Sequence, residues 1–249
     1  MKKLFKFLPI TLIYVLILIG IFAFSSGITL IILFIAFTFL FSLIQFFGAY
    51  LIGLNFHINS INSIQTTNKK VMLTFDDGPC KSTTPIVLEV LKKHQVSALF
   101  FLIGKNIKGN ESILKQIIEQ GNYIGNHSFS HHFWFDVWST KKVTADIAEC
   151  QELIEYYQPN KKLFRPPYGV TNPNIARALK KLGLISIGWN IRSYDTSIKD
   201  IEKINARILS QLKPGAIILL HDRLEFMPEL LEKLIPAIKE KGYTFTIEI

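Results

Sequence analysis

Apolar and polar positions divide this chain into two regions of different character. No charged side chain occurs from residue 7 to residue 54, and this apolar stretch divides at Ser25-Ser26-Gly27. A helix needs about 20 consecutive apolar residues to cross a bilayer. The pattern therefore predicts two transmembrane helices, at about 7–24 and 28–53, joined by a very tight turn. A single span followed by a membrane-buried segment is the alternative interpretation.

After residue 70, short apolar runs alternate with amphipathic stretches of helical spacing. The runs predict strands at 71–76, 98–103, 122–126, 162–165, 184–189, 216–220 and 243–248. The amphipathic stretches predict helices near 84–94, 111–120, 142–157, 173–182, 200–211 and 228–241. Regular alternation of this kind indicates parallel β/α construction. Seven strands are one short of a regular barrel, and a doubly wound open sheet is the structural alternative.

Polar clusters follow five of the predicted strands at their C-terminal ends. They occupy residues 74–79, 127–131, 165–169, 189–195 and 221–222. A parallel β/α barrel carries its chemistry at this end of its strands. The clusters therefore predict one shared site, although each cluster taken singly is also compatible with an ordinary turn.

The first two clusters contain candidate metal ligands. Asp76 and Asp77 are adjacent carboxylates, which repel one another unless a cation binds one and the other handles a proton. His127 and His131 are four residues apart, a spacing that lets both imidazoles share one metal ion from one side of a helical turn. Asp77, His127 and His131 would leave coordination positions open for water and substrate, as in catalytic sites. The alternatives are a simple Asp-Asp-Gly-Pro turn and a loop whose histidines face solvent.

Together, the clusters resemble the five motifs of the polysaccharide deacetylases with a NodB-type domain, carbohydrate esterase family four. The motifs occur in order: Thr74 to Pro79, His127 to His131, Arg165 to Gly169, a looser one centred on Asp195, and Leu219-Leu220-His221. The resemblance covers residues 69–249. It implies an α/β fold, a distorted and partly open (β/α) barrel of about seven parallel strands.

The resemblance also implies roles for the residues of the first three motifs. Asp77, His127 and His131 would hold a divalent metal, with Zn²⁺ preferred over Co, Ni, Fe or Mn. Asp76 would be the general base toward water, and Arg165 would pair with a site carboxylate and orient it.

The remaining roles concern the oxyanion, the leaving group and the acetyl pocket. The backbone N–H of Tyr168 would stabilise the oxyanion, and Tyr168 would also contact substrate. His221 would protonate the leaving amine, Asp195 would tune its neighbours by charge, and Leu219 would line the pocket for the acetyl methyl group.

One residue departs from the family pattern. Many relatives have Trp after the aspartate of the fourth motif, where it walls the acetyl pocket, but here Thr196 follows Asp195. Trp189, Tyr194 or another residue would then form the wall, and we expect Trp189 to bind substrate.

Composition adds three points about organisation and partners. The net charge is +9, but residues 1–68 contain three lysines and no acid, so the remaining residues carry only +6. No Lys/Arg-rich stripe with interleaved aromatic residues occurs, which argues against nucleic acid as a partner. We expect a membrane anchor at 1–54, a polar linker rich in Asn, Ser and Thr at 55–68, and a NodB-type domain at 69–249.

The expected function is metal-dependent removal of N-acetyl groups from amino sugars in a polysaccharide or oligosaccharide. Its partners would be a glycan of the cell envelope, or the precursor of one, and the lipid bilayer. The alternatives are an O-acetyl esterase acting on glycans and an inactive, membrane-anchored carbohydrate-binding protein.

We expect a multi-pass protein of the cell membrane, but the side that carries the domain is open. Lys2, Lys3 and Lys6 favour a cytoplasmic N-terminus. Two spans would then return the domain to the cytoplasm, whereas an envelope polymer lies outside. Oligomeric state is open too.

Overall fold

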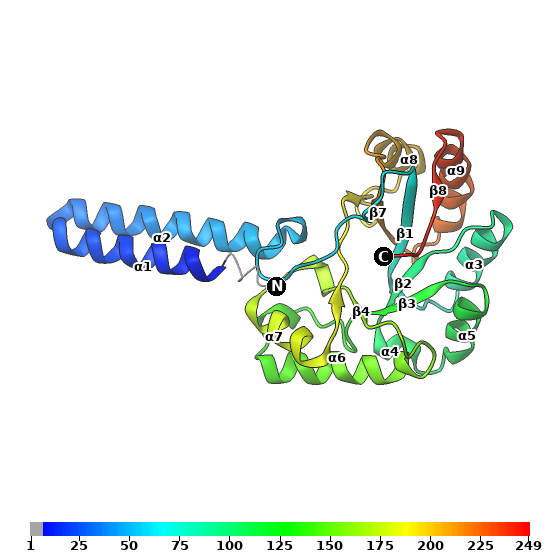
Figure 1. The fold of residues 1–249 in the computed structure, drawn as a ribbon, viewed down its shortest axis with the longest axis horizontal. Coiled ribbons are helices and arrows are strands. Elements are labelled where there is room, and N and C mark those ends of the chain that lie inside the picture. Colours follow the sequence, from blue (N-terminus) through cyan, green and yellow to red (C-terminus); the bar gives the residue numbers. More distant parts are fainter. Residues whose placement is uncertain (1–6) are drawn as a thin grey trace.

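The computed structural model describes residues 7–249, and an apolar helical hairpin projects from one side of a β/α domain (Figure 1). Helices α1 (Phe7–Phe24) and α2 (Gly27–Tyr50) lie side by side and antiparallel. Tyr14 joins them, because its hydroxyl lies 3.0 Å from the Thr38 hydroxyl and its ring stacks on Phe41 at 4.0 Å. Two helices are therefore present where the sequence predicts two.

The two helices differ in their capacity to cross a membrane. Within residues 7–249, α2 is the one helix that is long and apolar enough to span a bilayer, and none of its apolar window is buried in the protein. The apolar part of α1, Leu8–Phe24, is shorter. One span thus has support from length and composition, and the second span stays a proposal.

The domain is built on a curled parallel sheet with strand order β5-β4-β3-β2-β1-β7-β6, and β8 pairs with β1 off this path. The strands are β1 (Lys70–Gly78), β2 (Leu99–Leu102), β3 (Tyr123–Asn126), β4 (Leu163–Phe164), β5 (Ile185–Ser186), β6 (Ile191–Arg192), β7 (Ala216–His221) and β8 (Thr244–Phe245). This half-barrel of parallel strands with helices confirms the predicted fold.

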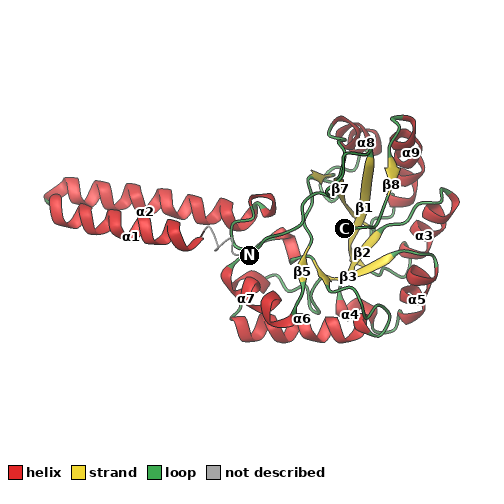
Figure 2. Cartoon of the chain, viewed as in Figure 1, coloured by secondary structure: helices red, strands yellow, loops and turns green. Residues whose placement is uncertain are grey.

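Helices cover the outer face of the sheet, as Figure 2 shows in red around the yellow strands. They are α3 (Thr84–Lys93), the short α4 (Gly104–Ile107), α5 (Glu111–Glu119), α6 (Thr140–Glu155), α7 (Pro173–Leu182), α8 (Ile201–Ser210) and α9 (Met227–Glu240). The short turns η1 (Ile52–Leu54), η2 (Phe135–Val137) and η3 (Pro167–Gly169) complete the helical elements of residues 7–249. The six predicted helices agree with the longer ones within two residues, but α4 has no counterpart in the sequence analysis.

Strand β1 shows how both faces of the sheet are buried. Its odd-numbered side chains, such as Leu73 and Phe75, join the large cluster between sheet and helices. Met72 instead joins the smaller cluster inside the half-barrel, together with Phe101 and Ile217. Side chains alternate between the faces of a strand, so Thr74 and Asp76 also point inward from β1.

The predicted strand over 184–189 is observed as the shorter β5, and β6, which begins two residues after that run at Ile191, has no counterpart in the sequence analysis. These consecutive strands stand at opposite ends of the strand order of the sheet. The sheet curls so far that residues 187–190 carry the chain from one edge to the other. An apolar run shows that a segment is buried, but it does not show where the strand ends and the chain passes to another edge.

The stretch that we expected to be a linker contributes to closing this gap. The N–H of Ile61 donates to Ser186 O at 2.9 Å, and Ile61 O accepts from the Gly188 N–H at 2.9 Å. Three residues later, the N–H of Ile64 donates to Gly215 O at 2.8 Å. Residues 61–64 therefore lie between the β5 edge and the start of β7, instead of serving only as a tether.

Candidate active site

Two adjacent carboxylates at the end of β1 line the same pocket, although neighbouring residues of a regular strand point to opposite faces. The explanation is a local irregularity. Asp77 has a φ of +74°, and the pairing with β2 shifts register between Asp76 and Gly78. In the ladder with β7, Asp76 lies opposite His221, so the first and last motifs of the sequence meet directly.

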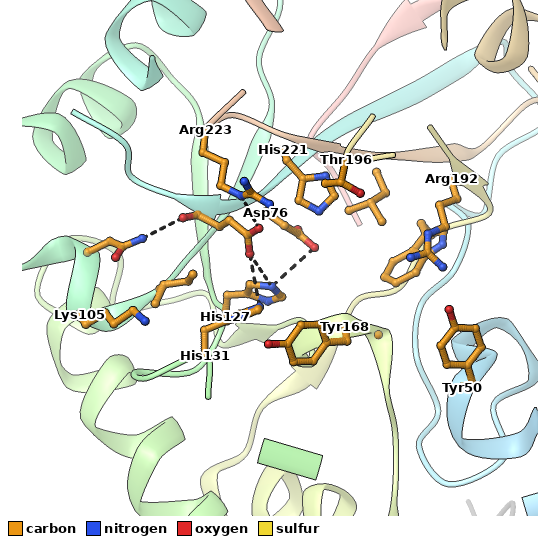
Figure 3. Close-up of a pocket in the computed structure, with 16 residues that line it drawn as sticks. Tyr50, Asp76, Lys105, His127, His131, Tyr168, Arg192, Thr196, His221 and Arg223 are labelled. Atoms are coloured by element: carbon orange, nitrogen blue, oxygen red, sulfur yellow. Dashed lines mark hydrogen bonds and ion pairs between the residues drawn. The ribbon is translucent and has the colours of Figure 1, made fainter. Parts of the chain in front are cut away.

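Three side chains form a candidate metal centre, one from the end of β1 and two from the loop after β3 (Figure 3). Asp77 Oδ1 lies 3.6 Å from His127 Nε2 and 3.4 Å from His131 Nε2. The ligand atoms of all three residues lie within 4.8 Å of one another. The histidines are carried by a loop with φ values of +68° at Ser128 and +45° at His131, and not by the helical turn that their spacing suggests.

The hydrogen bonds around His127 suit metal ligation. Its Nδ1 lies 2.8 Å from the carbonyl oxygen of Arg165, so Nδ1 carries the proton and donates it there. Nε2 is then left with a free lone pair facing Asp77. A backbone carbonyl that holds one ring nitrogen in this way is the usual partner of a metal-binding histidine.

The protonation states of this centre also fit a cation. Burial raises the pKa of Asp77, but the charges of His127, His221 and His131 and a hydrogen bond from Arg223 outweigh it, so its pKa is lowered. Burial, with the charge of His127, lowers the pKa of His131 to about 4. A deprotonated carboxylate beside a neutral imidazole is the state in which both bind a divalent ion.

Asp76 is held by a buried arginine. Arg165 is fully buried, and its Nη1 lies 2.7 Å from Asp76 Oδ1 and 2.8 Å from Thr74 Oγ1. The other guanidinium nitrogens donate to the carbonyl oxygens of Ile187 at 3.1 Å and Gly188 at 2.8 Å. Each guanidinium nitrogen is thus engaged, and Asp76 has one fixed orientation with Oδ2 3.8 Å from His127 Nε2.

A second acid–imidazole pair lies across the pocket. Asp195 accepts from His221 twice, from ring Nδ1 to Oδ1 at 2.8 Å and from the backbone N–H to Oδ2 at 2.8 Å. Burial lowers the pKa of His221, but the hydrogen bond and charge of Asp195 outweigh it, so the pKa is raised. His221 Nε2 remains for a partner in the pocket, and a raised pKa favours the protonated form that can donate there.

The residues expected at the oxyanion and acetyl positions line this pocket, which has a volume of about 790 Å³. Tyr168 has a φ of +59° within η3, and its ring lies 4.8 Å from that of His131. Leu219, Trp189 and Thr196 line the same pocket. Tyr194, the other candidate for the missing tryptophan wall, lies in an adjoining cavity, so Trp189 is the better candidate.

Five further polar residues line the pocket but were not singled out from the sequence. They are Tyr50, Lys105, Asn106, Arg192 and Arg223. Arg223 lies two residues after the last motif, and that position was a usable signal. Tyr50 belongs to the apolar hairpin, and no sequence signal connects it with the site.

These motifs and this half-barrel agree with comparisons to known proteins. The sequence profile of the polysaccharide deacetylase family matches residues 63–187, which is half of the chain. The chain belongs to this family. Its curated relatives include peptidoglycan N-acetylglucosamine, peptidoglycan N-acetylmuramic acid and chitooligosaccharide deacetylases.

Three similar proteins illustrate how closely this chain matches members of the family. The peptidoglycan-N-acetylglucosamine deacetylase PgdA of Listeria monocytogenes is 34% identical over 182 residues, which is 72% of this chain but only 38% of that protein. The structure of the Bc1960 peptidoglycan N-acetylglucosamine deacetylase superposes with a TM-score of 0.70 at 30% identity, covering 75% of this chain and 89% of that one. BA3943 of Bacillus anthracis, a carbohydrate esterase family four pseudoenzyme, gives 0.69 at 28% identity, covering 75% and 66%.

Proposed function

We propose that this protein is a metal-dependent hydrolase that removes the acetyl group from N-acetylated amino sugars. The carrying observation is the convergence of three ligand atoms within 4.8 Å, with Asp76 beside them. The names of the relatives support an N-acetylated glycan as the substrate class. One of the similar structures is a pseudoenzyme, so membership of the family does not by itself imply activity. This chain has the complete set of expected site residues, which favours an active enzyme.

The proposed metal ligands are Asp77, His127 and His131. Two imidazole nitrogens and one carboxylate oxygen with open positions are a ligand set typical of catalytic Zn²⁺, and Co, Ni, Fe or Mn are alternative ions. When bound there, the ion would polarise the acetyl carbonyl and lower the pKa of water to about 7.

The remaining steps are assigned to side chains of this chain. Asp76, oriented by Arg165, would accept the proton of the attacking water, a role worth about 10²- to 10⁴-fold in rate. The backbone N–H of Tyr168 would donate to the oxyanion. His221, oriented by Asp195, would donate a proton to the leaving nitrogen, because an amine leaves readily only when protonated.

We propose further that Leu219 and Trp189 form the walls of the pocket for the acetyl group. Trp189 would take the place of the wall that Thr196 cannot form. The ring of Trp189 rests against Gly169, where a Cβ atom would overlap it, so η3 and Trp189 form one surface.

For the chain as a whole, we propose a membrane anchor at residues 1–54, a connection at 55–68 and a catalytic domain at 69–249. Both α1 and α2 would cross the bilayer, giving a multi-pass protein of the cell membrane.

The test is acetate release by the full-length protein in detergent, with N-acetylglucosamine oligomers and O-acetylated glycans as substrates. We expect hydrolysis of the N-acetyl compounds, its loss on treatment with a chelator, and its return on addition of zinc. Hydrolysis of the O-acetyl compounds alone would make the protein an esterase. Glycan binding without any acetate release from metal-loaded protein would make it a carbohydrate-binding protein, and the proposal would fail.

A further inference from the structure

The C-terminal end of the apolar helix α2 forms part of the active-site pocket. Tyr50, its last residue, lines the same cavity as Asp77 and His131 (Figure 3). This contact is built in, because the carbonyl oxygen of Ala49 accepts a 2.8 Å hydrogen bond from the N–H of Thr171, three residues after Tyr168. The membrane-spanning helix is thus attached to the loop that carries the proposed oxyanion donor.

This attachment sets the distance between the pocket and the bilayer. The flank of α2 is apolar and exposed, as a lipid-facing surface must be. Tyrosine is enriched where a span leaves the hydrocarbon and meets the headgroups. Tyr50 therefore places one wall of the pocket at headgroup level, and the hairpin projects away from the domain on that side (Figure 1).

A second cavity of about 490 Å³ continues the pocket along the segment that follows α2. The two cavities share Tyr50, Trp189 and Arg192. The second cavity is lined on one side by residues 51–54 and on the other by polar residues that include Arg192 and Arg207. A ligand that fills both cavities would pass from the metal centre over Trp189 to the membrane surface.

The charge in the second cavity suits an anion. The guanidinium carbons of Arg192 and Arg207 lie 5.0 Å and 4.5 Å from the centre of the Tyr194 ring. Within residues 7–249, the arginines paired with a carboxylate are Arg165 and Arg223, so neither of these two guanidiniums has a carboxylate partner. Arg207 Nε donates instead to the carbonyl oxygen of Arg192 at 3.0 Å. Both guanidiniums line this cavity, and a phosphate there would accept charge-assisted hydrogen bonds from them. Basic pockets next to membrane helices are typical sites for anionic lipid groups.

We infer that the substrate is an amino sugar carried on a membrane lipid through a phosphate or pyrophosphate group. This inference rests on the proposed deacetylase function and narrows it. The sugar would occupy the pocket of Asp77 and His131, and the phosphate would lie near Arg192 and Arg207, with the lipid chain entering the bilayer beside α2. Water would cleave the amide C–N bond, acetate would leave, and the free amine would stay on the lipid-linked sugar.

The inference also removes a conflict over topology. A polymer in the wall must lie outside the membrane, whereas a lipid-linked sugar lies at the membrane surface and can belong to either leaflet. The three lysines near the N-terminus and two spans are therefore compatible with this substrate.

The test compares three compounds with the same sugar, using full-length protein in neutral phosphatidylcholine vesicles. They are N-acetylglucosaminyl-pyrophosphoryl polyprenol in the vesicle, UDP-N-acetylglucosamine and N-acetylglucosamine tetramer. We expect kcat/KM for the lipid-linked compound to exceed the other two by at least about tenfold.

Arginine variants test the proposed phosphate site. Loss of one charge-assisted hydrogen bond should lower affinity roughly tenfold. Arg192→Gln and Arg207→Gln should therefore each lower kcat/KM for the lipid-linked compound by that factor, and for the tetramer by less. Arg177→Gln, an exposed arginine on α7 outside both cavities, is the matched control and should change neither value.

Three results would overturn the inference while leaving the proposed function intact. Equal turnover of the nucleotide-linked sugar would show that a soluble phosphate suffices, and preferred turnover of the tetramer would indicate a polymer substrate. Equal losses for lipid-linked sugar and tetramer in the Arg192 and Arg207 variants would also count against it. If metal-loaded protein hydrolyses none of the three compounds, the deacetylase function itself fails, and the inference fails with it.

Discussion

Replacement of Asp76 by asparagine separates the general base from the metal centre. The substitution keeps the size of the side chain and removes its charge and its capacity to take a proton at neutral pH. Asp76 does not belong to the candidate metal centre. The ligand atoms that lie within 4.8 Å of one another come from Asp77, His127 and His131. We therefore expect Asp76→Asn to bind zinc with nearly unchanged affinity while losing turnover.

The expected sizes follow from the contacts of Asp76. Loss of a positioned base should lower kcat by about 10²- to 10⁴-fold. The partner, Arg165, is fully buried and pairs with Asp76 at 2.7 Å, so the substitution leaves a buried charge without its counter-ion. Breaking such a pair lowers the free energy of unfolding by about 3–5 kcal/mol. Asparagine Oδ1 can still accept a hydrogen bond from Arg165 Nη1, so we expect a loss at the lower end, about 3 kcal/mol. For a domain of this size, that loss corresponds to a fall in Tm of roughly 6–12 °C.

Three measurements on one preparation test this reasoning. Acetate release gives kcat, zinc titration of the chelator-treated protein gives metal affinity, and a thermal melt of the metal-free protein gives Tm. The exposed Glu89→Gln on α3 is a control for loss of one negative charge, and it should change none of the three. Full turnover in Asp76→Asn would refute the assignment of the base. Lost zinc binding would instead show that Asp76 is a ligand, and an unchanged Tm would contradict the argument about the buried pair.

Three further predictions concern the metal, the acid and the closure of the barrel. His127→Ala should weaken zinc binding by more than about 100-fold, since loss of a group that merely supports a ligand costs about 10- to 100-fold; a zinc titration that matches the parent protein would rule out His127 as a ligand. Asp195→Asn removes the carboxylate that raises the pKa of His221, so that pKa should fall. An acid works below its pKa, so the alkaline limb of the kcat profile should move to lower pH, and a limb that stays in place or rises would exclude His221 as the acid. Gly215→Ala combines a φ of +76° with overlap of the new Cβ and the backbone of segment 61–64, whereas Gly109→Ala has a φ of +84° in open space. We expect the first substitution to cost about 2 kcal/mol more than the second, seen as a lower Tm, and equal melts would show that segment 61–64 does not depend on this contact.

The sequence alone was sufficient for the local elements and the chemical inventory. Strand and helix periods are local properties, so the alternation after residue 70 predicted the six longer helices of the domain within two residues and the parallel β/α construction, whereas the partly open barrel was implied by the family resemblance. The polar residues at strand ends could be read as one site, because parallel strands bring their carboxyl ends to the same edge. The apolar hairpin was equally visible, since the absence of charge over residues 7–54 needs no tertiary information.

Only the tertiary structure decided how distant segments meet. It showed that the chain passes from one sheet edge to the other between Ser186 and Ile191, and that residues 61–64 lie between the β5 edge and the start of β7. It also brought Tyr50 and Arg192 to one pocket. Contacts of this kind depend on the curl of the whole sheet and on backbone hydrogen bonds between segments far apart in the chain. Hydropathy patterns carry no record of such partners, because a buried position looks the same in sequence whichever neighbour buries it.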